Sequence, residues 1–94
     1  MGKAVKLGDI DTGHEGFPPT PVISGSTSVF CEGRPMARKG DMLMPHTLPP
    51  APPHPRSIKE GSSSVFIDGK PAARSNDGVS CGGTLIGVST VNIG

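Results

Sequence analysis

A segment of 14 residues occurs twice in this chain, 36 positions apart, and this repeat limits the fold more than any other feature. Residues 25–38 read GSTSVFCEGRPMAR and residues 61–74 read GSSSVFIDGKPAAR, so the two copies align without a gap. A partial third copy opens the chain, and the final residues STVNIG resemble the start of another. We therefore expect three related units in permuted order, with both chain ends inside a repeat.

Each unit has the pattern of a β-hairpin. Ser-x-Ser-Val-Phe is rich in strand formers, Glu32-Gly33 or Asp68-Gly69 supplies the turn, and Pro-x-Ala-Arg begins the return strand. A helix is disfavoured, because Gly and Pro recur throughout and Pro35 and Pro71 would break one. The sequence predicts an all-β fold of three hairpins around a pseudo-threefold axis, joined by long loops rich in Pro and Gly.

The hairpins are expected to share one core, because a single hairpin is only marginally stable in water. We expect residues 1–94 to form a single domain. Cys31 aligns with Ile67 in the repeat, so we assign it to the core and not to a binding site. Only 33% of the residues are hydrophobic, which predicts an additional staple such as a metal ion. The residues expected to be buried are Val29, Phe30, Val65, Phe66, Val79, Leu85, Ile86, Val88, Val91 and Ile93.

Charge and hydropathy argue against several partners. The net charge is +1 and no basic run is longer than Arg38-Lys39, so neither nucleic acid nor a stable membrane anchor is expected. The N-terminal residues have no apolar export segment, so we expect the chain to fold in the cytoplasm. Cysteines in that compartment are thiols or metal ligands more often than disulfides. A Cys31–Cys81 disulfide is the alternative.

Four potential metal ligands occupy equivalent loops of the three units. His14 and His46 each follow the acidic residue of their unit by five positions, Cys81 follows it by four, and His54 shares the loop of His46. If the units surround one axis, three imidazoles and one thiolate meet in the number that a structural Zn²⁺ requires. The alternative is that the histidines are solvated and that Cys81 is a small buried hydrophobe. We predict one structural Zn²⁺ bound by His14, His46, His54 and Cys81.

The same ligand set argues against catalysis, and no catalytic residue is assigned. Three histidines and one cysteine complete a tetrahedron, which leaves no position for a reactive water. The serines of the repeat are interpreted as strand or turn groups, because no Gly-x-Ser-x-Gly elbow is present. We expect a protein that is not an enzyme.

Charged residues that recur with the unit have two possible roles. Asp9, Asp41 and Asp77 could orient ligand imidazoles, although Asp more often makes turns. Arg38 and Arg74 indicate either a repeated structural contact or a solvated charge.

One short motif identifies a family. Pro71-Ala72-Ala73-Arg74 spells the signature of the PAAR-repeat proteins, and Pro35-Met36-Ala37-Arg38 differs from it at one residue. The resemblance covers nearly the whole chain. It implies a small cone of three pseudo-threefold β-hairpins with a metal near the apex. Such a cone would cap and sharpen the trimeric β-helical spike (VgrG-like) of a type VI secretion system, one copy per trimer, to aid membrane puncture and, as a further role, effector carriage. In that family three histidines and one cysteine bind zinc, and by position these are His14, His46, His54 and Cys81.

The resemblance also implies a location. The protein would be cytoplasmic in the producing cell, assembled on the injection spike and delivered outward across the target membrane.

Three alternative functions are open: the tail-spike tip of a contractile phage, a zinc-dependent hydrolase toxin, and a free-standing zinc-binding adaptor that carries effectors. The side chains that contact the spike are not assigned.

Overall fold

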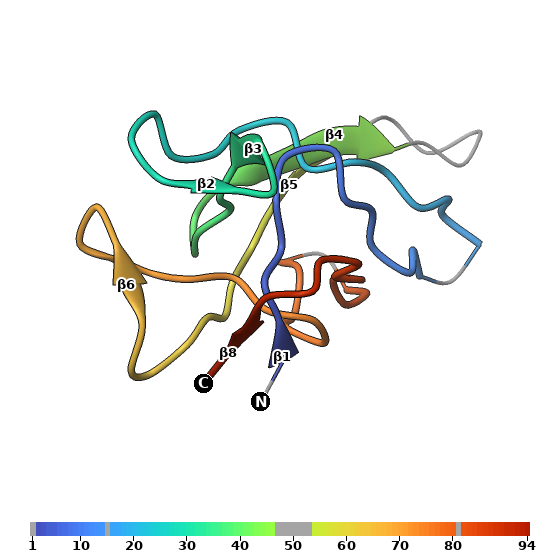
Figure 1. Ribbon diagram of the computed structural model, residues 1–94. Helices are drawn as coiled ribbons and strands as arrows, with labels where there is room; N and C mark the ends of the chain where they lie inside the picture. Colours follow the sequence, from blue (N-terminus) through green and yellow to red (C-terminus); the bar gives the residue numbers. More distant parts are fainter. Residues whose placement is uncertain (1, 15, 47–53, 81) are drawn as a thin grey trace.

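The computed structural model describes residues 2–14, 16–46, 54–80 and 82–94. Within these residues the regular elements are short strands without any helix, so none could cross a membrane as an apolar helix. The predicted all-β class is therefore confirmed. The strands, shown in Figure 1, are β1 (Gly2–Lys3), β2 (Phe30–Cys31), β3 (Arg34–Pro35), β4 (Met42–His46), β5 (His54–Ser57), β6 (Phe66–Ile67), β7 (Lys70–Pro71) and β8 (Asn92–Ile93).

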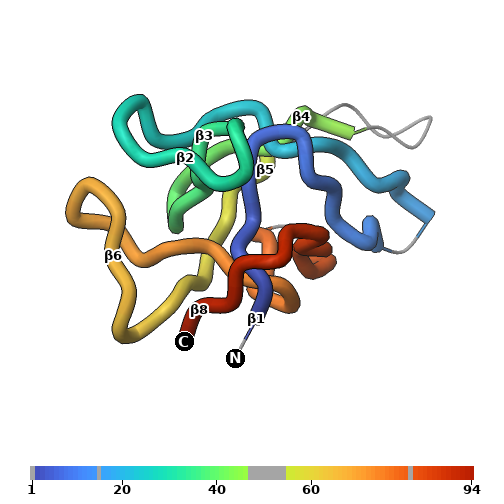
Figure 2. Tube along the Cα trace, viewed as in Figure 1, coloured from blue at the N-terminus to red at the C-terminus, as the bar shows by residue number. Residues whose placement is uncertain are grey.

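Antiparallel pairs join these strands in four two-stranded sheets. β2 pairs with β3 and β6 with β7, and both residues of each connecting turn, Glu32-Gly33 and Asp68-Gly69, have positive φ. Positive φ at both positions is the geometry of a type I′ hairpin turn, so the predicted turns are confirmed. The two chain ends pair in the same way as β8 and β1, and Figure 2 shows the termini side by side.

Three segments that align in the repeat surround a common centre. The backbone N–H of Ala37 donates to the carbonyl of Val5 (2.9 Å), that of Ala73 to Ala37 (3.0 Å), and that of Val5 to Ala73 (3.2 Å). These hydrogen bonds close a ring of three, and the three side chains are fully buried. The alanine that precedes each arginine of the repeated motif therefore lies at the middle of the molecule.

The core consists of two small clusters. One surrounds the central ring and the other lies under the hairpins, where Cys31 is buried as a free thiol. The assignment of Cys31 to the core is therefore confirmed. The first cluster contains Val5, Val22, Ala37, Leu43, Ile58, Ala73, Val79 and Leu85, and the second contains Ala4, Cys31, Met36, Ile67 and Ala72.

The predicted core was partly wrong. Val79 and Leu85 are buried, and Val65 and Ile93 are partly buried against the second cluster. Successive side chains of a strand point to opposite faces, so in β2 and β6 the second residue faces inward and the phenylalanine faces outward. The residues that are instead exposed are Val29, Phe30, Phe66, Ile86, Val88 and Val91.

Each repeated acidic residue closes a turn. Its carboxylate accepts the backbone N–H of the basic residue three positions earlier, at 2.7 to 3.1 Å, and pairs with the side chain of that residue. The preferred turn role, and the repeated structural contact of the arginines, are therefore observed. The three pairs are Lys6–Asp9, Arg38–Asp41 and Arg74–Asp77.

Candidate functional site

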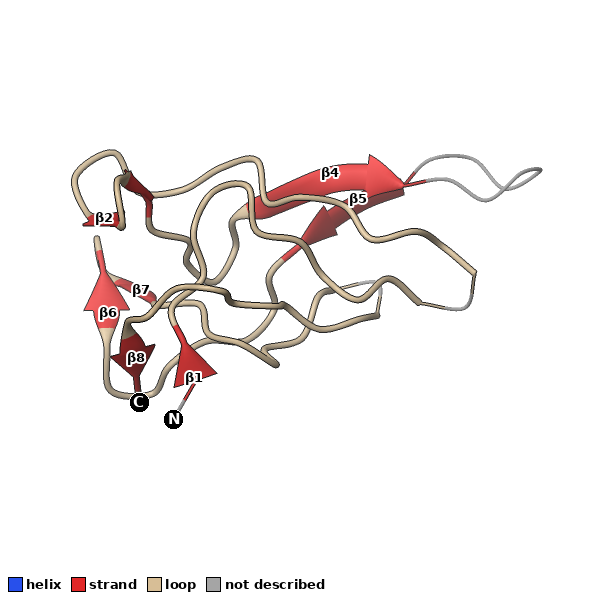
Figure 3. Ribbon diagram, turned by 45° about the vertical axis from the view of Figure 1, so that its right-hand side comes forward, coloured by secondary structure: helices blue, strands red, loops and turns tan. Residues whose placement is uncertain are grey.

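Two strands carry two of the predicted ligands to one end of the molecule. Figure 3 shows β4 and β5 running together away from the end that holds β2, β6 and β8. His46 is the last residue of β4, and it pairs with His54, the first residue of β5. The two backbones are therefore neighbours although eight positions separate them in the chain. The side chain of His54 and the whole of Cys81 lie outside the described residues.

His14 reaches this end in a tight turn. The N–H of Phe17 donates to the carbonyl of His14 (2.6 Å), and the N–H of His14 donates to the carbonyl of Phe17 (3.2 Å). The ring centroids of His14 and His46 are 5.0 Å apart, and the ring of Phe17 stacks against both of them. The structure thus brings two predicted ligands together and adds Phe17, which no sequence pattern had singled out.

The ring of His46 is held in one orientation. Its Nδ1 lies 2.9 Å from the carbonyl oxygen of Pro18. A carbonyl can only accept a hydrogen bond, so Nδ1 carries the proton and the lone pair of the neutral ring is on Nε2. Metal-binding histidines commonly donate their other ring nitrogen in this way, because the bond fixes the ring. This orientation leaves Nε2 as the ring nitrogen that could bind a metal ion.

A third loop approaches the same place. A Cβ built on Gly82 would lie 3.1 Å from Cγ of His14, and one built on Gly83 would lie 2.8 Å from the carboxylate of Asp11. Both glycines have positive φ, 107° and 86°, which favours glycine there. The residue that follows Cys81 therefore lies against the ring of His14.

These contacts fit a zinc site as far as the described residues extend. Two imidazoles bound to one tetrahedral Zn²⁺, at Zn–N distances of about 2.0–2.1 Å, have ring centroids about 5 Å apart. The rings of His14 and His46 meet this condition. Among the described residues, no group of three or more His, Cys, Asp or Glu side chains could hold a metal ion. The set of four ligands stays a prediction.

The close approach of Gly82 leads to a first testable result. We expect Gly82→Ala to reduce the free energy of unfolding by about 1–3 kcal/mol, because the new methyl group combines a strained φ with the contact to His14. Urea unfolding of both proteins measures the difference. Gly33→Ala is the matched control, because Gly33 also has positive φ but nothing lies within 4 Å of its Cβ position. An equal loss in both variants would show that the contact contributes nothing.

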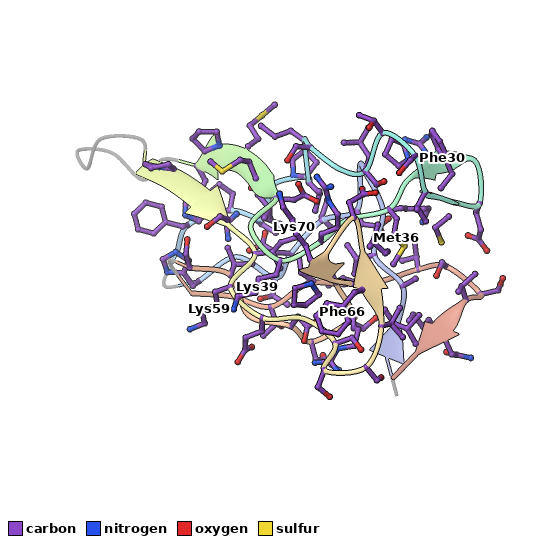
Figure 4. The ribbon with its side chains drawn as sticks, turned by 90° about the vertical axis from the view of Figure 1, so that its left-hand side faces the viewer. Phe30, Met36, Lys39, Lys59, Phe66 and Lys70 are labelled. Carbon is purple, nitrogen blue, oxygen red and sulfur yellow. The ribbon has the colours of Figure 1, made fainter. Side chains whose placement is uncertain are left out.

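The opposite end presents an apolar groove of about 380 Å³. Phe30 and Phe66 are 58% and 57% exposed there, at equivalent positions of the two full repeats. Figure 4 shows Phe30, Phe66 and Met36 at the hairpin end of the molecule, away from β4 and β5. The strands β2, β6 and β8 all contribute to the groove. Its lining residues are Val29, Phe30, Cys31, Glu32, Met36, Val65, Phe66, Ile67, Val91 and Ile93.

The repeated serines serve the backbone. The buried hydroxyl of Ser26 accepts the N–H groups of Ser28 and Val29, and that of Ser62 makes the same two bonds in the second copy. This agrees with their interpretation as turn groups.

Charged turn residues join neighbouring repeats. The carboxylate of Asp68 accepts hydrogen bonds from Ser26 and Ser28 of the first copy, and these bonds lower the pKa of Asp68. Glu32, at the same place of the first hairpin, accepts two bonds from Thr90 of the final copy, which lower its pKa as well. Each complete hairpin turn therefore holds the serine or threonine loop of another unit.

Comparison with known proteins gives one family. A family model described as the PAAR motif matches residues 12–87 of the chain, a span that contains both full copies of the repeat and all four predicted ligands. No curated protein sequence matches the chain significantly.

Proposed function

The chain belongs to the PAAR motif family, and from this premise we propose that it is a structural cap on the tip of a trimeric β-helical spike. The spike is that of a type VI secretion system, and the cap sharpens it for membrane puncture. The protein is made in the cytoplasm and carried outward with the spike. Effectors could travel on the same assembly. The alternative is the tip of the tail spike of a contractile phage.

Symmetry is the first support for this proposal. Val5, Ala37 and Ala73 close a ring of hydrogen bonds in which each residue donates to one neighbour and accepts from the other. This ring supports the proposal that the three units are related by a pseudo-threefold axis, and a single chain of that symmetry would present similar surfaces to three identical chains. One copy of the cap therefore suits one trimer, with residues 1–94 acting as a single domain.

The apolar groove indicates which end of the cap contacts the spike. Phe30 and Phe66 are large exposed side chains on neighbouring hairpins, and rigid aromatic side chains are frequent anchors of protein interfaces. We propose that the blunt end of the trimeric spike covers this end of the cap.

Zinc at the opposite end would hold the loops at one rigid point. His14, His46, His54 and Cys81 would bind it, and a set of four ligands supplies cross-linking without a reactive water. The contact between the first two rings and the bond from His46 to Pro18 support this assignment. The role we propose is therefore structural and not catalytic.

The observation that carries the proposal is the separation of two unlike ends. One has an apolar groove over the hairpins, and the other has the contacting imidazole rings of His14 and His46 at the end of β4. Native mass spectrometry of the chain purified with a VgrG-like trimer tests it. We expect a mass of one chain, three spike chains and one zinc ion. Three caps per trimer, or no complex, would refute the cap. A complex without zinc would refute the metal assignment alone.

A further inference from the structure

A fully buried ion pair lies beside the predicted metal end. The side chains of Arg56 and Asp11 are both 0% exposed, and Nη2 of the guanidinium contacts the Asp11 carboxylate. Nη1 donates to Asp11 Oδ1 (3.2 Å) and to the hydroxyl of Thr20 (2.6 Å). Nη2 also reaches the carbonyl oxygen of Gly82 at 3.5 Å. One guanidinium on β5 therefore contacts three residues from two loops.

These loops are the ones that carry the predicted ligands. Asp11 is three residues from His14, and Gly82 is next to Cys81. Arg56 belongs to β5, whose first residue is a further predicted ligand and pairs with the end of β4. The side chain of Arg56 therefore adds direct contacts between the segments that carry the predicted ligands.

Stability alone does not account for this pair. Two charges removed from water pay a desolvation cost, and apolar side chains of similar volume often replace such a pair without loss. Burial is the largest influence on the pKa of Asp11 and raises it, but the bonds from Arg56 and Thr20 with the charge of Arg56 outweigh burial and lower this pKa. Asp11 is therefore ionised at neutral pH, and the pair imposes a fixed geometry on the segments it joins.

We propose that Arg56, anchored by Asp11, is a positioning residue for the metal ligands. It sets the loops of Asp11 and Gly82 in register with β5 before zinc binds, so that the ion meets a preformed set of ligands. This inference rests on the zinc site of the proposed function. Its consequence is that loss of the pair weakens zinc binding even when the fold is retained.

The test removes both charges together, so that neither remains buried alone. In Asp11→Asn with Arg56→Met, the amide oxygen still accepts the N–H of Thr20, which Asp11 accepts at 3.0 Å in the native chain. The zinc Kd is measured by competition with a chromophoric chelator, and Co²⁺ absorption reports the coordination geometry. We expect zinc binding to weaken by about 10- to 100-fold, with altered Co²⁺ bands, as for other residues that orient metal ligands.

The matched control makes the same changes at another ion pair. Arg74→Met with Asp77→Asn breaks a pair that lies within a single turn, and the guanidinium of Arg74 also donates to the carbonyl of Gly61. We expect zinc affinity and the Co²⁺ spectrum of this variant to be unchanged.

Each remaining outcome decides the proposal. If the native chain binds zinc and the Asp11/Arg56 variant binds it equally well, the positioning role is wrong and the metal site stands. If the native chain binds no zinc, both fail. If the double variant does not fold, Thr20→Val replaces it, because it removes one acceptor of Arg56 and keeps the ion pair. An unchanged zinc Kd in Thr20→Val would then overturn the positioning role.

Discussion

Removal of zinc with a chelator is expected to lower the stability of this protein more than any single core substitution. The two hydrophobic clusters are small and contain several alanines, so apolar burial supplies little of the folding free energy. Structural Zn²⁺ contributes apparent free energies of about 10–16 kcal/mol in zinc-finger peptides, comparable to the whole stability of a domain. Thermal unfolding followed by circular dichroism, with and without chelator, should show a large fall in Tm that added Zn²⁺ reverses.

Two variants make this result specific. His46→Ala should lower the Tm toward that of the chelated protein and abolish the response to chelator. Leu43→Ala, a fully buried core change that costs about 2–5 kcal/mol, should lower the Tm but keep the response. If native protein unfolds at the same temperature with and without chelator, zinc is not part of the fold.

Local sequence signals were sufficient for the hairpins. The Glu32-Gly33 and Asp68-Gly69 turns require only two adjacent residues that tolerate positive φ, and the repeat locates them without tertiary information. The repeat also placed Cys31 correctly, because Ile67 marks the same position as apolar.

The direction of the phenylalanines could not be predicted. Val-Phe-x supplies two or three consecutive apolar residues, so the sequence contains no alternation to show which face is inward. Residues that were not expected in the core, such as Met36 and Ala72, fill the centre under the hairpins instead. With that space taken, Phe30 and Phe66 remain at the surface.

The sequence also predicted only part of the candidate metal end. Repeat equivalence named His14 and His46 as neighbours, and the structure places their rings in contact. The groups that contact His46, the Phe17 ring and the Pro18 carbonyl, lie outside the 14-residue repeat and are far from His46 in the chain. A single sequence holds no periodic signal for such contacts.

Spike binding is expected to be lost when both phenylalanines of the groove become acidic. In Phe30→Asp with Phe66→Asp, the proposed interface would have to bury two carboxylates among apolar side chains, which costs several kcal/mol and predicts at least about 100-fold weaker binding. Both positions are more than half exposed in the isolated chain, so the free energy of unfolding should change little. Titration calorimetry with the trimeric spike and urea unfolding measure the two effects separately.

A substitution to aspartate outside the groove is the matched control. Met44 is an exposed apolar residue, 49% accessible, on β4 and outside the groove. Met44→Asp should therefore leave spike binding intact, because β4 leads away from the hairpin end (Figure 3). Equal losses in both variants would mean that charge anywhere on the cap disrupts docking. If the Phe30/Phe66 variant binds the spike as tightly as the native chain does, the spike-binding surface lies on another face. The two exposed aromatic rings would then have no role in this interface.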